Sequence, residues 1–298
     1  MQLDAVPSAA LRYDEKALAF PCAGEWLVGV ATLPAPPAAP YPRGVLVVVG
    51  GPQYRAGSHR QFTLLARALA EQGIPAMRFD VRGMGDSGGD ALGFEDQEAD
   101  IHAAIDAFMA CVPGMREVVL WGLCDGASAA AMYAGSDARV AGLVLLNPWV
   151  RTEESLAKAT LKHYYRERLL APDLWKKIAG GRFGLRDSLS SLLGQVRRAM
   201  QPPASPQLVA GTACGATLPE RMHAGLARFP GPVLVVLSGA DLTAREFADL
   251  TAASPQWRQL MAAPRFTRRQ LAPADHTFSR RAWRDEVAAW TAQWVRSW

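Results

Sequence analysis

The stretch Val119–Ser128 reads VLWGLCDGAS and places a cysteine at the centre of a Gly-x-Cys-x-Gly pattern. An apolar, strand-like run precedes this pattern, and small helix-forming residues follow it. A sharp turn from strand to helix holds its central residue in a strained conformation, so the residues two positions away must be very small. Gly122 and Gly126 meet that demand. The stretch therefore predicts a strand, a tight turn that presents Cys124, and a helix.

Such a turn places the sulfur of Cys124 beside the N-terminus of the following helix. The partial positive charge at that end favours the thiolate form of cysteine. The negative charge of Asp125, the next residue, partly opposes the effect. A thiol with a neighbouring base is a strong nucleophile, so we expect Cys124 to be one.

The rest of the sequence alternates between strand and helix patterns. Continuous apolar runs such as GVLVVV (Gly44–Val49) are typical of strands buried on both faces of a parallel sheet. The predicted strands are 17–20, 26–33, 44–49, 75–79, 117–121, 140–146, 232–237 and 267–271. The predicted helices are 62–72, 97–112, 127–133, 244–250 and a C-terminal helix with Trp283, Val287, Trp290 and Trp294 on one face. This pattern predicts an α/β fold: a mostly parallel sheet of about eight strands with helices on both faces.

The alternation stops between residues 148 and 229, where helix formers and charged residues dominate. We interpret 148–229 as a helical cap insertion, and 1–147 with 230–298 as the core. Residues 151–200 hold eleven Lys and Arg against five acids, a charge of +6 in a chain of net charge +4. This charge fits either a solvated helical face or attraction to an anionic substrate, carrier or membrane surface. No nucleic-acid motif accompanies it, so we expect no nucleic-acid partner.

Two polar residues follow the last two predicted strands. Asp241 comes after strand 232–237, and His276 comes after strand 267–271. Ligands of such sheets bind beyond the carboxyl ends of the strands, so these residues are expected to meet Cys124 there. His276 would take the thiol proton, and Asp241 would hold the imidazole in the useful tautomer. Asp275 is the weaker acid candidate, because adjacent side chains rarely face each other.

From about Val45 onward the sequence resembles the α/β-hydrolase superfamily. Five segments together resemble a narrower group: GGPQYRAGSHRQF (50–62), FDVRGMGDSGG (79–89), WGLCDGAS (121–128), GADLTAREF (239–247) and DHTFS (275–279). That group is the exosortase A system-associated hydrolases, subtype 1, encoded beside exopolysaccharide genes in Gram-negative bacteria. In having a cysteine in the place of the nucleophile, the chain also resembles dienelactone hydrolase. The resemblance implies an α/β-hydrolase fold and ester or thioester chemistry, but no particular substrate.

An oxyanion hole needs two hydrogen-bond donors. The backbone N–H of Asp125 is the first, and the second is expected from the loop after strand 44–49. Many members of the superfamily have His-Gly-x there, whereas this chain has Gly50-Gly51-Pro52, and Pro52 has no N–H. We therefore expect the second donor to be Gln53. The same wall is expected to contact substrate through Tyr54, Arg55, His59 and Arg60.

Three functions fit these residues. The first is an esterase or thioesterase that works through an acyl-thioester enzyme intermediate on a small-molecule or carrier-linked acyl substrate. The second is an acyltransferase acting on a saccharide or lipid-linked acceptor, and the third is a non-catalytic binding protein. No metal-ligand cluster or dinucleotide motif is present, so we expect no metal and no cofactor.

The four cysteines are far apart and form no C-x-x-C pair. The N-terminus lacks the pattern of a signal peptide, and no apolar run reaches the ~18 residues that a membrane span needs. These features predict a reduced cytoplasmic protein without stable membrane insertion. Peripheral membrane association and the oligomeric state stay open.

Overall fold

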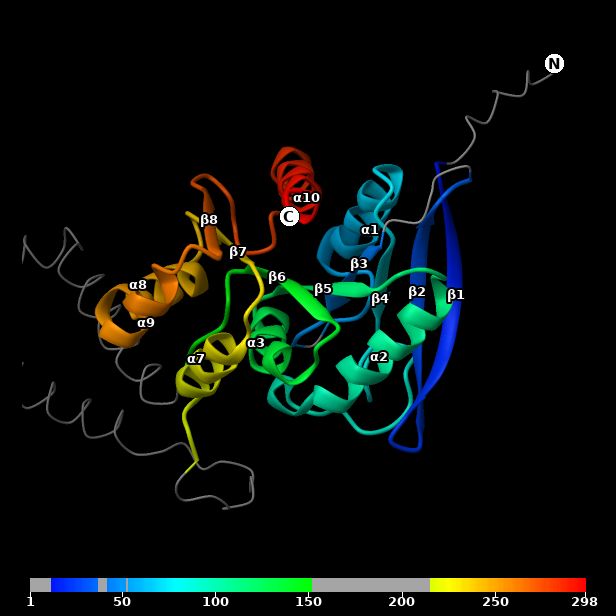
Figure 1. Cartoon of the computed structure of the whole chain (residues 1–298), viewed down its shortest axis with the longest axis horizontal. Helices are drawn as coiled ribbons and strands as arrows, with labels where there is room; N and C mark the ends of the chain where they lie inside the picture. Colours follow the sequence, from blue (N-terminus) through cyan, green and yellow to red (C-terminus); the bar gives the residue numbers. More distant parts are fainter. Residues whose placement is uncertain (1–11, 37–41, 52, 152–214) are drawn as a thin grey trace, which may run out of the picture. The chain divides into compact units, whose positions relative to one another are not determined.

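A computed structural model describes residues 12–36, 42–51, 53–151 and 215–298 of the chain. Within them, eight strands form one sheet in the order β1-β2-β4-β3-β5-β6-β7-β8 (Figure 1). The strands are β1 Tyr13–Cys22, β2 Glu25–Pro34, β3 Arg43–Val48, β4 Ala76–Phe79, β5 Glu117–Leu123, β6 Val140–Leu146, β7 Val233–Ser238 and β8 Phe266–Leu271. The pairs β1–β2 and β2–β4 are antiparallel, and all the others are parallel. The predicted mostly parallel α/β sheet is confirmed.

Helices cover both faces of this sheet (Figure 1). They are α1 Gln61–Glu71, α2 Glu98–Cys111, α3 Asp125–Tyr133, α7 Leu218–Arg228, α8 Leu242–Ala253, α9 Pro255–Met261 and α10 Arg281–Val295, with short 3₁₀ turns η1 Ser58–Arg60, η2 Phe94–Asp96 and η3 Ala134–Ser136. Helices α1 and α10 pack on one face, and α2, α3, α7, α8 and α9 contribute to the core on the other. In the described part of the chain, no helix is both long and apolar enough to cross a membrane.

Strand β5 explains why the central runs are continuously apolar. Its side chains alternate between the two cores: Val118 and Leu120 belong to one, Val119 and Trp121 to the other. All four are at most 3% exposed. Full burial of a Val or Leu side chain contributes about 1.5–3 kcal/mol, so polar residues are excluded from both faces here.

The parallel pairing brings the carboxyl ends of β5, β6, β7 and β8 to one edge of the sheet. Leu123 at the end of β5 pairs with Leu146 in β6, and Leu146 pairs with Val236 in β7. Ser238, the last residue of β7, pairs with Leu271 in β8. The residues that follow these strands are therefore neighbours in space although they are up to about 150 positions apart in sequence.

The structure adds one helix that the sequence analysis did not predict. Helix α9 begins at Pro255, a residue favoured at the first helical position. The Ser254 side chain caps this end by accepting a hydrogen bond from the backbone N–H of Trp257.

The predicted cap, 148–229, stays a prediction, because only its two ends are among the described residues. Helix α7, inside that range, belongs to the compact unit that contains the sheet, residues 1–150 and 218–298. The second unit is 151–217. Residues 152–214, with nearly all of the basic segment and most of the predicted cap, lie outside the described residues.

Candidate active site

Cys124 occupies the turn between β5 and α3 with φ 57° and ψ −120°. A non-glycine residue in this region of φ/ψ space is strained and is held there only by its surroundings. Three glycines allow that packing. A Cβ on Gly122 would collide with the backbone of Gly126, and a Cβ on Gly126 would collide with the carbonyl of Val48. A Cβ on Gly50 would strike the backbone N of Gly126, so the loop after β3 also lies against this turn.

The structure brings His276 and Asp241 together. The distance between His276 Nδ1 and Asp241 Oδ2 is 2.9 Å, and the Asp241 side chain is 8% exposed. The same carboxylate caps α8, because it accepts hydrogen bonds from the backbone N–H groups of Thr243 (3.3 Å) and Ala244 (2.9 Å). Burial raises the pKa of Asp241, but the hydrogen bonds from His276 and from the helix outweigh it, so the net shift is downward. Asp241 is therefore a charged acceptor held in a fixed orientation.

The side chain of Asp275, the weaker acid candidate, forms hydrogen bonds within its own turn. Its carboxylate accepts hydrogen bonds from the backbone N–H and the hydroxyl of Ser279. Burial raises the pKa of Asp275, but the hydrogen bonds from Ser279 and from the backbone N–H of Thr277 outweigh it, so the net shift is downward.

The protonation of Cys124 differs from the expectation. Burial, and then the charge of Asp125, raise the pKa of the Cys124 thiol to about 12. The sulfur lies 3.5 Å from Asp125 Oδ1, which accepts the thiol hydrogen, while the backbone N–H of Asp125 acts in the opposite direction. Burial and this carboxylate thus raise the pKa of the thiol more than the backbone N–H of Asp125 lowers it, which favours the neutral thiol. Burial also raises the pKa of Asp125, although the thiol and the charge of His276 oppose the shift.

The two N–H groups expected to form the oxyanion hole have different surroundings in the structure. The backbone N–H of Asp125 acts on the Cys124 sulfur and lowers the pKa of the thiol, and its role as first oxyanion donor stays a prediction. The N–H of Gln53, predicted as the second donor, instead donates to the carbonyl of Gly51 at 2.8 Å. The Gln53 side-chain oxygen is buried and has no partner among the described residues. Gln53 lies in the loop expected to form the oxyanion hole, but in this structure its backbone N–H is hydrogen-bonded to the Gly51 carbonyl.

The predicted substrate wall divides into two parts. Tyr54, His59 and Arg60 are exposed, and both His59 and Arg60 have positive φ just before α1. Arg55 is not free to meet substrate in the same way. Its guanidinium forms ion pairs with Asp80 and Asp86, and its backbone N–H donates to Asp80 Oδ1 at 2.6 Å. Arg55 thus anchors the loop after β3 to the loop after β4, and its contact with substrate stays a prediction.

Two polar residues that the sequence analysis missed lie between the strand ends. Asn147 follows β6, Ser238 ends β7, and they are 0% and 3% exposed. The amide and the hydroxyl are hydrogen-bonded to each other and to the backbone of the histidine loop. The available signal was an asparagine placed directly after the apolar run LVLL and before a proline.

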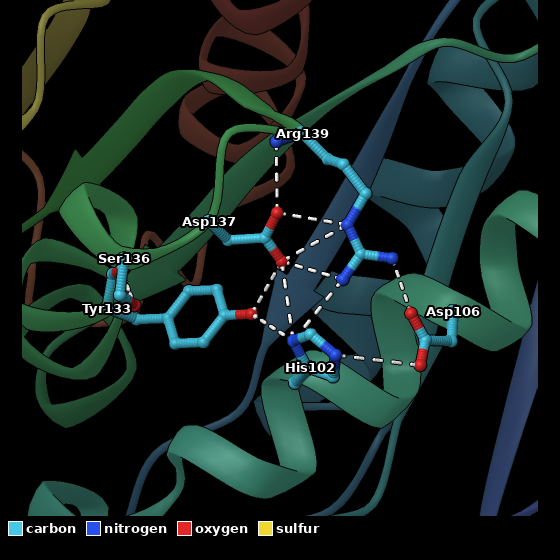
Figure 2. A network of polar contacts seen from close by, with 6 residues as sticks. All are labelled: His102, Asp106, Tyr133, Ser136, Asp137 and Arg139. Atoms are coloured by element: carbon cyan, nitrogen blue, oxygen red, sulfur yellow. Dashed lines mark hydrogen bonds and ion pairs between the residues drawn. The ribbon is translucent and has the colours of Figure 1, made fainter.

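A second polar network lies away from these residues and joins α2 to the end of α3 and the turn before β6 (Figure 2). His102 contacts the Tyr133 hydroxyl at 3.2 Å and Asp137 at 3.5 Å. Arg139 forms ion pairs with Asp137 and Asp106. Among the described residues, no group of three or more His, Cys, Asp or Glu side chains is arranged to hold a metal ion.

Solved structures share the fold at low sequence identity. An esterase of Pyrococcus furiosus has a TM-score of 0.62 at 14% identity, with 97% of this chain and 94% of that chain covered. A cold-adapted esterase from an Arctic intertidal metagenomic library has a TM-score of 0.57 at 18% identity, covering 99% and 98%. A serine hydrolase without lid from Xanthomonas campestris has a TM-score of 0.55 at 19% identity, covering 96% and 97%.

Among curated proteins, no sequence matches this chain. The family model described as "Alpha/beta hydrolase family" matches residues 16–290, which is most of the sequence. This match agrees with the strand order and with the tight turn after β5. The chain belongs to the alpha/beta hydrolase family.

Proposed function

We propose that this protein hydrolyses esters or thioesters, with Cys124 as nucleophile, His276 as general base and Asp241 as the partner of the histidine. The observation that carries the proposal is the 2.9 Å contact between His276 Nδ1 and Asp241 Oδ2 at the strand edge where Cys124 stands at φ 57°. A nucleophile, a base and a group that orients the base are the three parts that acyl transfer requires. The esterases among the structural neighbours support the same class of reaction.

The resting site holds its proton on sulfur. Because burial and Asp125 raise the pKa of the Cys124 thiol to about 12, we expect a neutral thiol at physiological pH and no preformed thiolate–imidazolium pair. Asp241 is charged and accepts the Nδ1 proton of His276, which leaves Nε2 as the basic nitrogen. Deprotonation of the thiol therefore accompanies attack on the substrate and does not precede it.

The reaction then follows in two halves. Cys124 Sγ bonds to the acyl carbon while His276 Nε2 takes the thiol proton, and the carbonyl oxygen becomes an oxyanion near the N–H of Asp125. Collapse expels the alcohol or thiol, which leaves with that proton. His276 next takes a proton from water as the water attacks the acyl-thioester. Cys124 leaves as thiolate and recovers the proton from His276, and the carboxylic acid is released.

The chemistry favours activated acyl donors. A thiolate is a good leaving group. When the substrate's own leaving group is a poor one, the tetrahedral intermediate therefore expels the Cys124 thiolate again and returns to the substrate. Thioesters, lactones and activated esters are therefore the expected substrates, and plain amides are not. The resemblance to exosortase-associated hydrolases supports a role beside exopolysaccharide synthesis, and the basic segment 151–200 supports donors with anionic groups, such as acyl carriers.

The proposal is tested with a panel of p-nitrophenyl esters and acyl-CoA thioesters, each with and without saccharide acceptors. Intact-mass spectrometry should detect one acyl adduct, mapped to Cys124, and released acid should account for the turnover. Cys124→Ala should abolish both, whereas Cys111→Ala, which alters another partly buried cysteine in α2, should change neither. Acyl transfer to an acceptor without release of acid would replace hydrolase by acyltransferase. Neither an adduct nor released acid with any donor would overturn catalysis and leave a binding protein.

A further inference from the structure

A buried amide at the end of β6 lies where the loops carrying Cys124, Asp241 and His276 meet. Asn147 is 0% exposed and has φ 43°, in the left-handed region that asparagine tolerates better than most residues. Its own backbone N–H donates to the carbonyl of Val236 in β7 at 3.1 Å. The backbone here is held by β7, and the side chain is turned toward the loops beyond the sheet.

Every hydrogen-bonding group of the Asn147 amide has a partner. Nδ2 donates to Ser238 Oγ at 2.8 Å and to the carbonyl of His276 at 2.9 Å. Oδ1 accepts from the backbone N–H of Ser238 at 2.9 Å. The Ser238 hydroxyl in turn donates to the carbonyl of Asp275 at 2.8 Å. Since a carbonyl can only accept and an N–H can only donate, these partners also fix which way the amide points.

The same turn is bonded to the backbone of the nucleophile. The N–H of Cys124 donates to the carbonyl of Leu146 at 2.9 Å, and the N–H of Trp149 donates to the carbonyl of Cys124 at 3.4 Å. The loop of Asp241 joins the histidine loop directly, because the N–H of Ala240 donates to the carbonyl of Ala274 at 3.0 Å. Asn147 is therefore the residue whose side chain contacts the histidine loop while its turn contacts Cys124.

We propose that Asn147 is a positioning residue, with Ser238 as its partner, which sets the place of His276 relative to Cys124. The inference rests on the proposed function and extends it. The Asn147 amide fixes the backbone of His276 at its carbonyl, and Asp241 fixes the imidazole at Nδ1. His276 is therefore held both at its backbone and at its ring. Catalytic groups must stay within about 0.5 Å of productive geometry, and a misplacement of about 1 Å can cost about 10²-fold in rate.

The test is Asn147→Asp, which keeps the shape of the side chain but replaces the donating NH₂ by an oxygen facing the His276 carbonyl. We expect kcat per titrated active site to fall by about 10–100-fold, with KM changed by less than about threefold. Ser238→Ala keeps the bond from Asn147 to the His276 carbonyl and removes the two bonds of the hydroxyl, to the Asn147 amide and to the Asp275 carbonyl, so its loss should be smaller. If Asn147→Asp does not fold, a normal kcat for folded Ser238→Ala overturns the proposal.

A double-mutant cycle separates positioning from general stability. In a His276→Ala background, Asn147→Asp should lower the residual rate by less than about twofold, because there is no imidazole left to position. A loss as large as in the wild-type background would mean that Asn147 acts on something other than His276.

One measurement does not depend on any substrate. The proton NMR signal of His276 Nδ1–H, shifted far downfield by its bond to Asp241, should broaden or move in Asn147→Asp. Such a change supports positioning even if no ester is turned over, in which case only the proposed activity fails. An unchanged signal in the folded variant overturns positioning, whatever its activity.

Discussion

Two histidines among the described residues contact a buried aspartate, and the two sites differ in the other groups that bind the carboxylate. His276 Nδ1 lies 2.9 Å from Asp241, and His102 Nδ1 lies 3.5 Å from Asp137. The two carboxylates are almost equally buried, at 8% and 7% exposure. Burial and proximity to a histidine are therefore common to both pairs.

The difference is in the other partners. Asp137 is bound by the Arg139 guanidinium and by the Tyr133 hydroxyl, and the hydrogen bond to Arg139 is the main reason that its pKa is lowered (Figure 2). Among the described residues, Asp241 has no ion pair with lysine or arginine; its partners are His276 and two α8 amides. The charge of Asp241 is thus left to stabilise an imidazolium, whereas that of Asp137 is already neutralised. The arrangement at Asp241 is therefore the one that fits the proposed mechanism, in which His276 gains a proton.

The largest effect should come from removing each histidine. His276→Ala should lower kcat/KM by about 10²–10⁴-fold, because it removes the general base. His102→Ala, at the other pair, should leave kcat/KM within about twofold. Both are measured on the best ester of the panel, and equal losses in the two variants would remove the distinction drawn here.

The second test changes the two carboxylates without changing their shape. Asp241→Asn should lower kcat by about 10²-fold or more, because the amide no longer supports the imidazolium or its tautomer. The alternative acid is probed with Asp275→Asn, which should retain most activity because that side chain caps its own turn. Full activity in Asp241→Asn together with loss in Asp275→Asn would assign the acid to Asp275.

Asp137→Asn should affect stability and leave kcat nearly unchanged. Removing the charge that compensates Arg139 should cost about 1–3 kcal/mol in the free energy of unfolding, measured in urea at pH 7. The folded-state pKa of Asp137 is lowered, so its contribution is present above the unfolded pKa of about 3.9 and is lost as pH falls below it. The gap between wild type and Asp137→Asn should accordingly narrow below about pH 4. A constant gap at acid pH would show that charge is not the cause.

A smaller effect is expected at the nucleophile. Asp125→Asn removes a charge that raises the Cys124 pKa but leaves burial, the larger cause, in place. The alkylation rate with iodoacetamide at pH 8 should rise by about three- to tenfold, because a larger fraction of the thiol is ionised. In wild type the rate should keep climbing through pH 10. A plateau near neutral pH would reveal a preformed thiolate and contradict the resting state described above.

The smallest effect concerns the basic segment. Charge reversal of Lys176 and Lys177 should reduce the salt dependence of kcat/KM for an anionic acyl-CoA. The salt dependence for a neutral ester should stay the same. The reason is that salt screens charge–charge attraction over a Debye length of about 10 Å at 0.1 M. A change of about twofold is expected. Equal salt dependence for the two substrates in wild type would reduce the segment to a solvated face.

The sequence predicts well what depends on local pattern. Strands β5 and β7 were predicted because both faces are buried, and the turn at Cys124 because glycines must flank it. The triad stays a prediction, although its polar members follow the strands as expected. Contacts between distant segments were not predictable: Asn147 meets partners 91 and 129 residues away, and Arg55 finds its carboxylates 25 and 31 residues away.

The sequence analysis expected the helix N-terminus to favour the thiolate of Cys124, whereas the pKa of the thiol is raised, and the reason for this difference is another one. The helix N-terminus can be read from the sequence, but the depth of burial and the direction of the Asp125 side chain cannot. These two factors decide the sign of the shift.

The order of the strands along the chain has a consequence for biosynthesis. Cys124 emerges from the ribosome 152 residues before His276, and β7 and β8 follow a long stretch that separates them from β6. At about 5–20 residues per second, the cysteine precedes its base by about 8–30 s. During that interval the nascent chain carries an isolated thiol with no imidazole from β8 to activate it. A ribosome-bound chain stalled before residue 276 should therefore be inert toward esters, and acyl transfer should begin only when the last strand joins the sheet.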